Sequence, residues 1–540
     1  MTDSTPPPEP ITDYEIGQDN IRPFGLDIHN PVFIISGLSI IFFVVLTLMF
    51  QKEATDFFGW LRPFLTSNFD WFFLTAGNIF VLFCLILIIT PLGSVRLGGP
   101  DAVPEYGYIG WFAMLFAAGM GIGLMFFGVS EPISHFSSSL GGTAIEAGAR
   151  TDWAPLAAAA GDPIAARDLA MAATIFHWGL HPWAIYAVVG LALAFFAYNY
   201  DLPLTLRSAF YPLFGERVWG WTGHIIDTLA VFATLFGLAT SLGFGTEQAL
   251  AGLNFLFGVP TSNVSRVVLI TLITAAALIS VIRGLDGGVK VLSEINIALA
   301  LLLMVFIIAV GPTAQILETI AHGATAYLTE LVPLSNPFGR EDTNFMQGWT
   351  AFYWAWWISW SPFVGMFIAR VSRGRTVREF VFCVMIVPTL VSIFWMGAFG
   401  GTAIAQVMAD PDAAVKGADL ELKLFEMLKH LPLASVTSLL GIVLVIVFFV
   451  TSSDSGSLVI DTITAGGKTD APVAQRVFWA SFEGLVAATL LLVGGAGALT
   501  ALQAMAVSTG FPFTIVLLLM CVSLTIGLVR ERARISVTAT

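Results

Sequence analysis

Apolar runs of about 20 residues recur twelve times along the chain, with short polar segments between them. A helix of that length crosses the hydrocarbon core of a bilayer. The pattern therefore predicts an all-α polytopic membrane protein with a single transmembrane domain over residues 31–529. We expect a disordered tail over residues 1–30, which are Pro-rich and acidic, and a short tail over 530–540. The predicted spans are centred near residues 40, 80, 118, 184, 236, 273, 302, 359, 390, 449, 484 and 517.

The composition supports this class, because 56% of the residues are hydrophobic and only 11% are charged. The first 30 residues lack the basic and apolar regions of a signal peptide. Placing both termini in the cytoplasm puts 15 Lys and Arg residues in cytoplasmic segments and nine outside. This bias predicts cytoplasmic termini. The net charge of −13 comes mostly from the tail and the outer loops, and nothing indicates a nucleic-acid partner.

Two predicted helices carry interruptions, one over residues 117–123 and one over residues 360–365. The first contains three glycines within five residues and the second contains Trp360-Ser361-Pro362, so each segment can unwind. Small residues can also serve close helix packing. The two segments lie five helices apart, which favours broken helices at the start of two inverted repeats, helices three to seven and helices eight to twelve.

Aromatic residues are concentrated in the eighth predicted helix, where five of the 15 tryptophans fall within residues 349–360. Hydrocarbon packing does not require so many indoles. An interfacial aromatic belt would leave them near the helix ends, whereas these lie in the middle of the span. Tyr353, Trp357 and Trp360 follow an i, i+4, i+7 spacing and therefore share a face.

A second aromatic group lies in the fourth predicted helix. Trp178, Trp183 and Tyr186 fall within an arc of about 140° on an ideal helix. Gly179 and Pro182 should bend this segment. Taken alone, Trp178 and Trp183 fit an aromatic belt as well as a ligand site.

Together the two groups predict a box of π faces that binds a cation. A quaternary ammonium or sulfonium has no N–H to donate, and desolvated indole faces suit it at about 1–2 kcal/mol each. We expect no acidic residue near these rings, because Glu131 is expected at a helix end. His177 and His181 lack a paired acid or nucleophile in the sequence and are interpreted as packing residues, so the pattern does not predict an enzyme.

The tenth predicted helix contains Thr451-Ser452-Ser453-Asp454-Ser455. Hydroxyls and freed carbonyls in mid-membrane are hard oxygen ligands that suit Na⁺, although Ser and Thr can instead bond to their own helix. Asp454 is an ionisable group inside the membrane, and the sequence leaves open whether it is functional or a structural anchor.

These motifs resemble the betaine/carnitine/choline transporter family, most closely its sodium-coupled glycine betaine and dimethylsulfoniopropionate symporters. The resemblance rests on Gly119-Met120-Gly121-Ile122-Gly123, Glu131-Pro132, residues 177–186, residues 356–363 and residues 451–455. It implies twelve helices, with two peripheral helices before a LeuT-like core of five plus five inverted repeats. It also implies a homotrimer, alternating access, and a location in the bacterial inner membrane among its lipids.

The resemblance also assigns residues, which fall into an aromatic set and an oxygen set. It implies a substrate box of Trp178, Trp183, Tyr186 and Trp357, with Trp356 and Trp360 along the route and Phe363 as a gate. It implies a Na⁺ site made by the backbone carbonyls of Ala117, Met120 and Phe448 and the hydroxyls of Thr451 and Ser452. A possible second Na⁺ site would use Thr234, but Leu238 stands where a second threonine is expected.

Sodium coupling is favoured within this resemblance. Sodium-independent exchangers place a basic side chain near the cation site, whereas residues 224–258 contain no Lys or Arg. Proton-coupled choline carriers place an acid in the glycine stretch, where this chain keeps Gly123. The expected function is Na⁺ symport of glycine betaine or dimethylsulfoniopropionate. The alternative is a choline or carnitine carrier, coupled to protons or working by exchange; a channel or membrane enzyme is less favoured. Only three arginines follow residue 529, so we expect weak or absent activation by osmotic stress.

Overall fold

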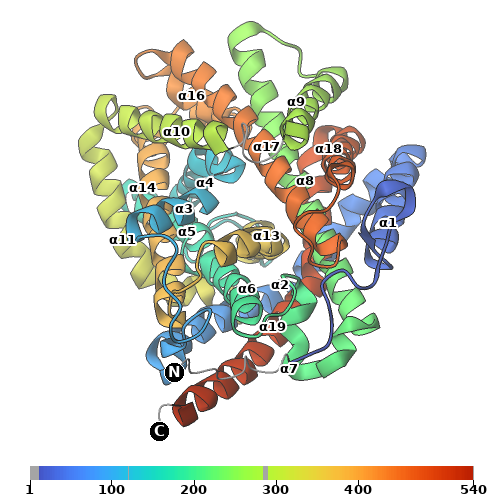
Figure 1. Ribbon diagram of the computed structural model, residues 1–540. Coiled ribbons are helices and arrows are strands. Elements are labelled where there is room, and N and C mark those ends of the chain that lie inside the picture. Colours follow the sequence, from blue (N-terminus) through green and yellow to red (C-terminus); the bar gives the residue numbers. More distant parts are fainter. Residues whose placement is uncertain (1–10, 120, 284–289, 539–540) are drawn as a thin grey trace.

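The computed structural model describes residues 11–119, 121–283 and 290–538 (Figure 1). Every predicted span centre falls inside an α-helix, which confirms the all-α polytopic class. Among the described residues, ten helices or helix pairs are long and apolar enough to cross a membrane. The broken α3–α4 pair and α13 fall outside these ten, so the total of twelve spans stays a prediction.

The long helices occur in the following order. They are α1 (Val32–Met49), α2 (Gln51–Ile89), α3 (Tyr108–Gly119), α4 (Ile122–Leu140), α5 (Pro163–Trp178), α6 (Leu180–Asn199), α8 (Trp221–Phe257), α9 (Asn263–Arg283), α10 (Lys290–Val310), α11 (Thr313–Ser335), α13 (Ala351–Arg370), α14 (Val377–Ala409), α17 (Ala434–Thr464), α18 (Val473–Gly494) and α19 (Ala498–Thr538).

Short elements connect them. These are α7 (Tyr211–Phe214), α12 (Thr343–Phe345), α15 (Ala414–Gly417), α16 (Lys423–Lys429), and two antiparallel hairpins, β1 (Asn20–Ile21) with β2 (Ile28–His29) and β3 (Ile145–Glu146) with β4 (Ala149–Arg150).

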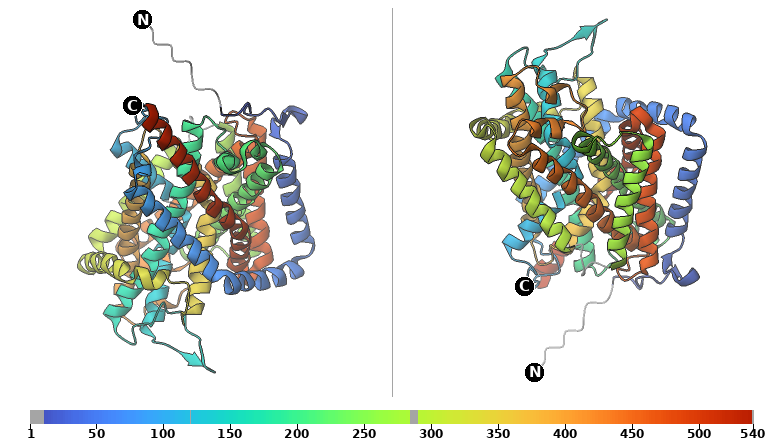
Figure 2. Two further views of the ribbon diagram at one scale, coloured as in Figure 1. Left: turned by 90° about the horizontal axis from the view of Figure 1, so that it is seen from below. Right: turned by 90° about the horizontal axis from the view of Figure 1, so that it is seen from above.

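Helix α13 lies in the middle of the bundle, whereas α1 stands at its edge (Figure 1). The central helix packs against α6, α8 and α19. The start of the described chain and the end of α19 lie at the same end of the molecule, and the β3–β4 hairpin projects from the opposite end (Figure 2). This arrangement agrees with the prediction that both termini lie on one side of the membrane.

The predicted interruption in the third span is confirmed. Helix α3 ends at Gly119 and α4 begins at Ile122, and Gly121 between them has an extended backbone (φ −169°, ψ −170°). The backbone therefore leaves the helical path in the middle of the span. Met120 lies outside the described residues.

The predicted bend in the fourth span is also confirmed, as a full break at Gly179 (φ −104°, ψ −131°) between α5 and α6. A Cβ at this position would lie 2.6 Å from the Ile175 carbonyl oxygen, so the close turn requires glycine. The Leu180 N–H, which has lost its helical partner, donates to the hydroxyl of Tyr327 on α11 at 3.1 Å. Trp178 therefore lies on α5, whereas Trp183 and Tyr186 lie on α6.

The predicted break in the eighth span is wrong. Helix α13 runs without interruption from Ala351 to Arg370 and contains Pro362. A proline cannot donate to the carbonyl four residues earlier, which here belongs to Ile358. The Ser361 hydroxyl donates to that carbonyl at 2.7 Å, so the lost backbone bond is replaced and the helix continues. The irregular turn of this span lies earlier, at the π-helical η6 (Met346–Thr350).

Candidate functional site

A cavity of about 230 Å³ lies between α13 and the α3–α4 break, with α5, α6, α8, α10 and α17 completing its walls. It brings together most of the residues that the sequence singled out. Ten of them line it: Ala117, Trp178, Tyr186, Trp356, Trp357, Trp360, Phe363, Phe448, Thr451 and Ser452.

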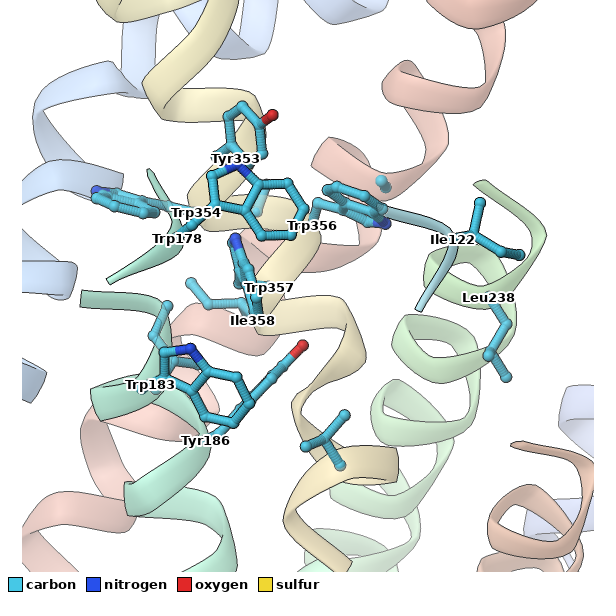
Figure 3. Close-up of a cluster of buried hydrophobic side chains, with 14 of the residues drawn as sticks. Ile122, Trp178, Trp183, Tyr186, Leu238, Tyr353, Trp354, Trp356, Trp357 and Ile358 are labelled. Atoms are coloured by element: carbon cyan, nitrogen blue, oxygen red, sulfur yellow. The ribbon is translucent and has the colours of Figure 1, made fainter. Parts of the chain in front are cut away.

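Trp357 is the central ring of the aromatic side (Figure 3). Its ring centroid lies 5.4 Å from that of Trp178, in an edge arrangement at 79°, and 5.0 Å from that of Tyr186. Trp183 packs behind these rings, 5.4 Å from Tyr186 and 6.0 Å from Trp357. Trp178, Tyr186 and Trp357 therefore face the cavity, while Trp183 supports two of them from outside the lining that the described residues form.

Two further indoles are fixed by hydrogen bonds to α8. Trp356 Nε1 donates to the Ser241 hydroxyl at 3.2 Å, and Trp360 Nε1 donates to the Gly237 carbonyl at 2.9 Å. Phe363 packs edge-on against Trp360 with centroids 5.3 Å apart. These three aromatic residues of α13 line the cavity beside the box.

Gly123 allows the rings to approach the α3–α4 break. A Cβ at this position would lie 2.8 Å from Cη2 of Trp178 and 3.1 Å from Cη2 of Trp356. The backbone of α4 therefore touches both indoles, and an acidic side chain here would displace them. Gly123 therefore has a packing role.

A buried carboxylate lies directly behind the box, contrary to the expectation that no acid lies near these rings. Glu131 is in the middle of α4 and fully buried. It accepts hydrogen bonds from Trp178 Nε1 at 2.7 Å and from the Tyr353 hydroxyl at 2.5 Å. The expectation failed because residues after Pro132 continue the same helix to Leu140, so Glu131 is not at its end.

The interpretation of His177 as a packing residue without an acid partner is also wrong. Its Nδ1 lies 2.5 Å from Glu131 Oε1, and His135 Nε2 lies 3.2 Å from the same oxygen. The i, i+4 spacing of Glu131 and His135 was a signal that could have been noticed in the sequence. His181 does act in packing, since its ring stacks on Trp354 at 9°.

Glu131, His135 and His177 lie close enough to be considered as metal ligands, with their ligand atoms within 4.8 Å of one another. Two ligands on one tetrahedral zinc ion are about 3.3 Å apart. The distance of 2.5 Å between His177 Nδ1 and Glu131 Oε1 is shorter and is that of a hydrogen bond. The group is therefore a hydrogen-bond network.

Hydroxyl-bearing residues of α17 also line the cavity. The Thr451 hydroxyl donates to the Val447 carbonyl at 3.0 Å and the Phe448 carbonyl at 3.3 Å, which leaves its lone pairs free for a cation. Ser452 lines the cavity beside it, and Ala117 faces it from the end of α3. Hydroxyl and carbonyl oxygens suit Na⁺, so the described part of the predicted ligand set fits this ion.

The comparisons with known proteins agree with this geometry. The profile of the betaine/carnitine/choline family of transporters matches residues 31–533. The chain belongs to this family. It is 65% identical over 524 residues to a glycine betaine/proline/choline transporter of Vibrio parahaemolyticus, an alignment that covers 96% of this chain and 94% of the relative.

Two less similar family members also align over most of their length. A glycine betaine transporter of the same Vibrio strain is 56% identical, with 96% of this chain and 98% of the relative covered. A glycine betaine transporter of Bacillus subtilis is 43% identical, with 88% and 89% covered. The resemblance read from the motifs is therefore confirmed, as is the prediction that the chain is a transporter and not an enzyme.

The second Na⁺ site considered for this betaine/carnitine/choline family member is not supported. Thr234 is buried on α8 and its hydroxyl donates to the Ala230 carbonyl of its own helix at 2.7 Å. A Cβ at Gly456 of α17 would lie 2.2 Å from a methyl group of Leu238, so this leucine fills the space between the two helices. An apolar contact stands where a second set of oxygen ligands would be needed.

Other polar residues were missed or left open by the sequence. Asp454 points away from the cavity and accepts from the Ser280 hydroxyl of α9 at 2.9 Å, which is a link between helices. Ser293 and Asn296 of α10 line the cavity although no motif marked them. They lie with Glu294 near the start of an otherwise apolar helix, and a search for amide side chains within spans would have found Asn296.

Proposed function

We propose that this protein is a secondary active transporter that imports a methylated onium zwitterion by Na⁺ symport. Glycine betaine and dimethylsulfoniopropionate are the favoured substrates. The observation that carries the proposal is that aromatic and hydroxyl-bearing residues, which come from helices far apart in sequence, line one cavity.

The aromatic side would hold the onium head. Trp178, Tyr186 and Trp357 present rings from three helices around one space, and indole faces attract a cation that has no N–H to donate. The Nε1 atom of Trp357 is buried and has no hydrogen-bond partner among the described residues. It is therefore a donor available to the carboxylate of a zwitterion.

The oxygen side would hold the coupling ion. Ala117 and Phe448 offer carbonyls, and Thr451 and Ser452 offer hydroxyls, at the edge of the same cavity. Binding of Na⁺ there would join α17 to the end of α3, whose break forms part of the substrate site. We propose that this shared boundary couples ion binding to substrate binding and to alternating access.

The remaining features follow the family. We propose a bacterial inner-membrane location with cytoplasmic termini and a homotrimer. Choline and proline, named for the Vibrio relative, are alternative substrates, because both are cationic at nitrogen.

Uptake into proteoliposomes tests the proposal. Labelled glycine betaine should enter with saturable kinetics when an inward Na⁺ gradient is imposed, and unlabelled dimethylsulfoniopropionate should compete. Uptake driven by a proton gradient without Na⁺ would show that transport is coupled to protons and not to Na⁺. A non-saturating flux would favour a channel.

A further inference from the structure

Glu131 is connected to the substrate cavity only through other side chains. Trp178 of α5 and Tyr353 of α13 donate hydrogen bonds to its carboxylate. Ring nitrogens of His177 on α5 and His135 on its own helix lie within hydrogen-bond distance of the other oxygen. Trp178 is the member of this network that lines the cavity. A charge on Glu131 would therefore act on the site through the indole of Trp178.

The arrangement suits an ionised carboxylate, which can accept from all four groups. An indole N–H can only donate, so Trp178 fixes one lone pair of Oε2 as an acceptor, and the tyrosine hydroxyl lies within 2.5 Å of the same oxygen. The two histidine nitrogens occupy the other oxygen. A carboxylate is acceptor-only with about four lone-pair sites, and this environment fills them.

An anion at the N–H end of an indole pushes electron density toward its ring. The face of Trp178 that borders the cavity becomes more negative, and the attraction of a cation to an aromatic face depends on that negative charge. A carboxylate inside the cavity would instead favour ligands with an N–H to donate. Among the described residues that line the cavity there is no Asp or Glu.

We propose that Glu131 is a positioning residue that selects for a positively charged head group by polarising Trp178. This inference rests on the proposed function, since it concerns how the same box distinguishes an onium from an uncharged group of the same shape. His177 and Tyr353 hold the carboxylate in line with the indole, and Thr350 continues the network by its contact with His177 Nε2 at 2.9 Å.

The test compares two ligands of equal shape and different charge. Glycine betaine and tert-butylacetate differ only in that carbon replaces the cationic nitrogen. Their dissociation constants are measured by displacement of labelled glycine betaine from purified wild-type protein and from Glu131→Gln. We expect the substitution to raise the dissociation constant of glycine betaine about tenfold, which is the scale of one cation–π contact. The dissociation constant of tert-butylacetate should change by less than about threefold. Equal weakening of both ligands would show that Glu131 only holds the helices together, and would overturn the proposal.

A second variant keeps the test decisive if Glu131→Gln does not fold. Tyr353→Phe removes one donor from Oε2 but leaves the carboxylate charge and the Trp178 hydrogen bond. Its affinity for glycine betaine should stay within about twofold of wild type or increase. A loss as large as that expected for Glu131→Gln would mean that network geometry, and not charge, matters, which also overturns the proposal.

The design separates this inference from the proposed function. If wild-type protein does not bind glycine betaine, the proposed function fails. If wild type binds it and Trp357→Ala abolishes binding, while the ratio of the two dissociation constants is unchanged in Glu131→Gln, only the role of Glu131 fails.

Discussion

Three indoles that line the cavity are held by hydrogen bonds to other helices, whereas the Thr451 hydroxyl is held within its own helix. Trp178 is tied to α4 by Glu131, and Trp356 is tied to α8 by Ser241. Thr451 bonds only to carbonyls of α17 among the described residues. Fixed rings are ready for a ligand before it arrives, while a hydroxyl that satisfies its own helix can be recruited by an ion. The difference suggests that the substrate side is preorganised and that the ion side is completed on binding.

Removing the central ring is the strongest way to break the aromatic side. Trp357→Ala should weaken glycine betaine binding about 100-fold, because a buried indole at the centre of a site contributes most of the contact energy. Tryptophan fluorescence quenching in detergent measures this affinity. Trp221→Ala is the control, since that indole is 67% exposed at the start of α8. Unchanged affinity in Trp357→Ala would refute the box.

Removing a hydroxyl tests the oxygen side separately. Thr451→Ala should raise the Na⁺ concentration for half-maximal uptake about tenfold, because one ligand oxygen is lost. Affinity for glycine betaine at saturating Na⁺ should change little. Initial uptake rates in proteoliposomes at varied Na⁺ give both values. An effect on substrate affinity alone would move Thr451 from the ion site to the substrate site.

Helix α13 carries several of the rings, and its continuity at Pro362 depends on the Ser361 hydroxyl. Ser361→Ala leaves the Ile358 carbonyl without the bond that replaces the one lost at Pro362, and should lower stability by about 1 kcal/mol. Thermal unfolding followed by circular dichroism measures the change. Ser481→Ala is the matched control, because the Ser481 hydroxyl bonds to the Val477 carbonyl of a helix whose backbone bond is intact. An equal effect of both substitutions would show that Ser361 has no special role at the proline.

The smallest effect is expected at Thr234. Thr234→Val should leave the Na⁺ dependence of uptake within about twofold of wild type, since its hydroxyl bonds to its own helix and Leu238 fills the neighbouring space. The same uptake assay applies. A large rise in the Na⁺ requirement would restore the second ion site and extend the oxygen side to α8.

The sequence by itself determined the helices and the chemical types at the site. Apolar run length is a local property, so all twelve centres fell within helices. The glycine-rich break and the bend at Gly179 were also local, because they depend on backbone freedom. The aromatic and hydroxyl motifs, together with Ala117 and Phe448 from the family resemblance, identified ten lining residues.

Tertiary structure decided which of those features met. The predicted break at Pro362 was wrong because the Ser361 hydroxyl donates to the Ile358 carbonyl, which the proline leaves without a backbone donor. A rule based on proline alone does not include this side chain. Glu131 joined the box because residues 131, 177 and 353 converge across three helices. Leu238 packs against Gly456 of another helix, a contact that the sequence alone did not reveal. Hydropathy measures how well one segment suits a lipid environment. The environment of a buried polar group depends instead on the helices packed around it.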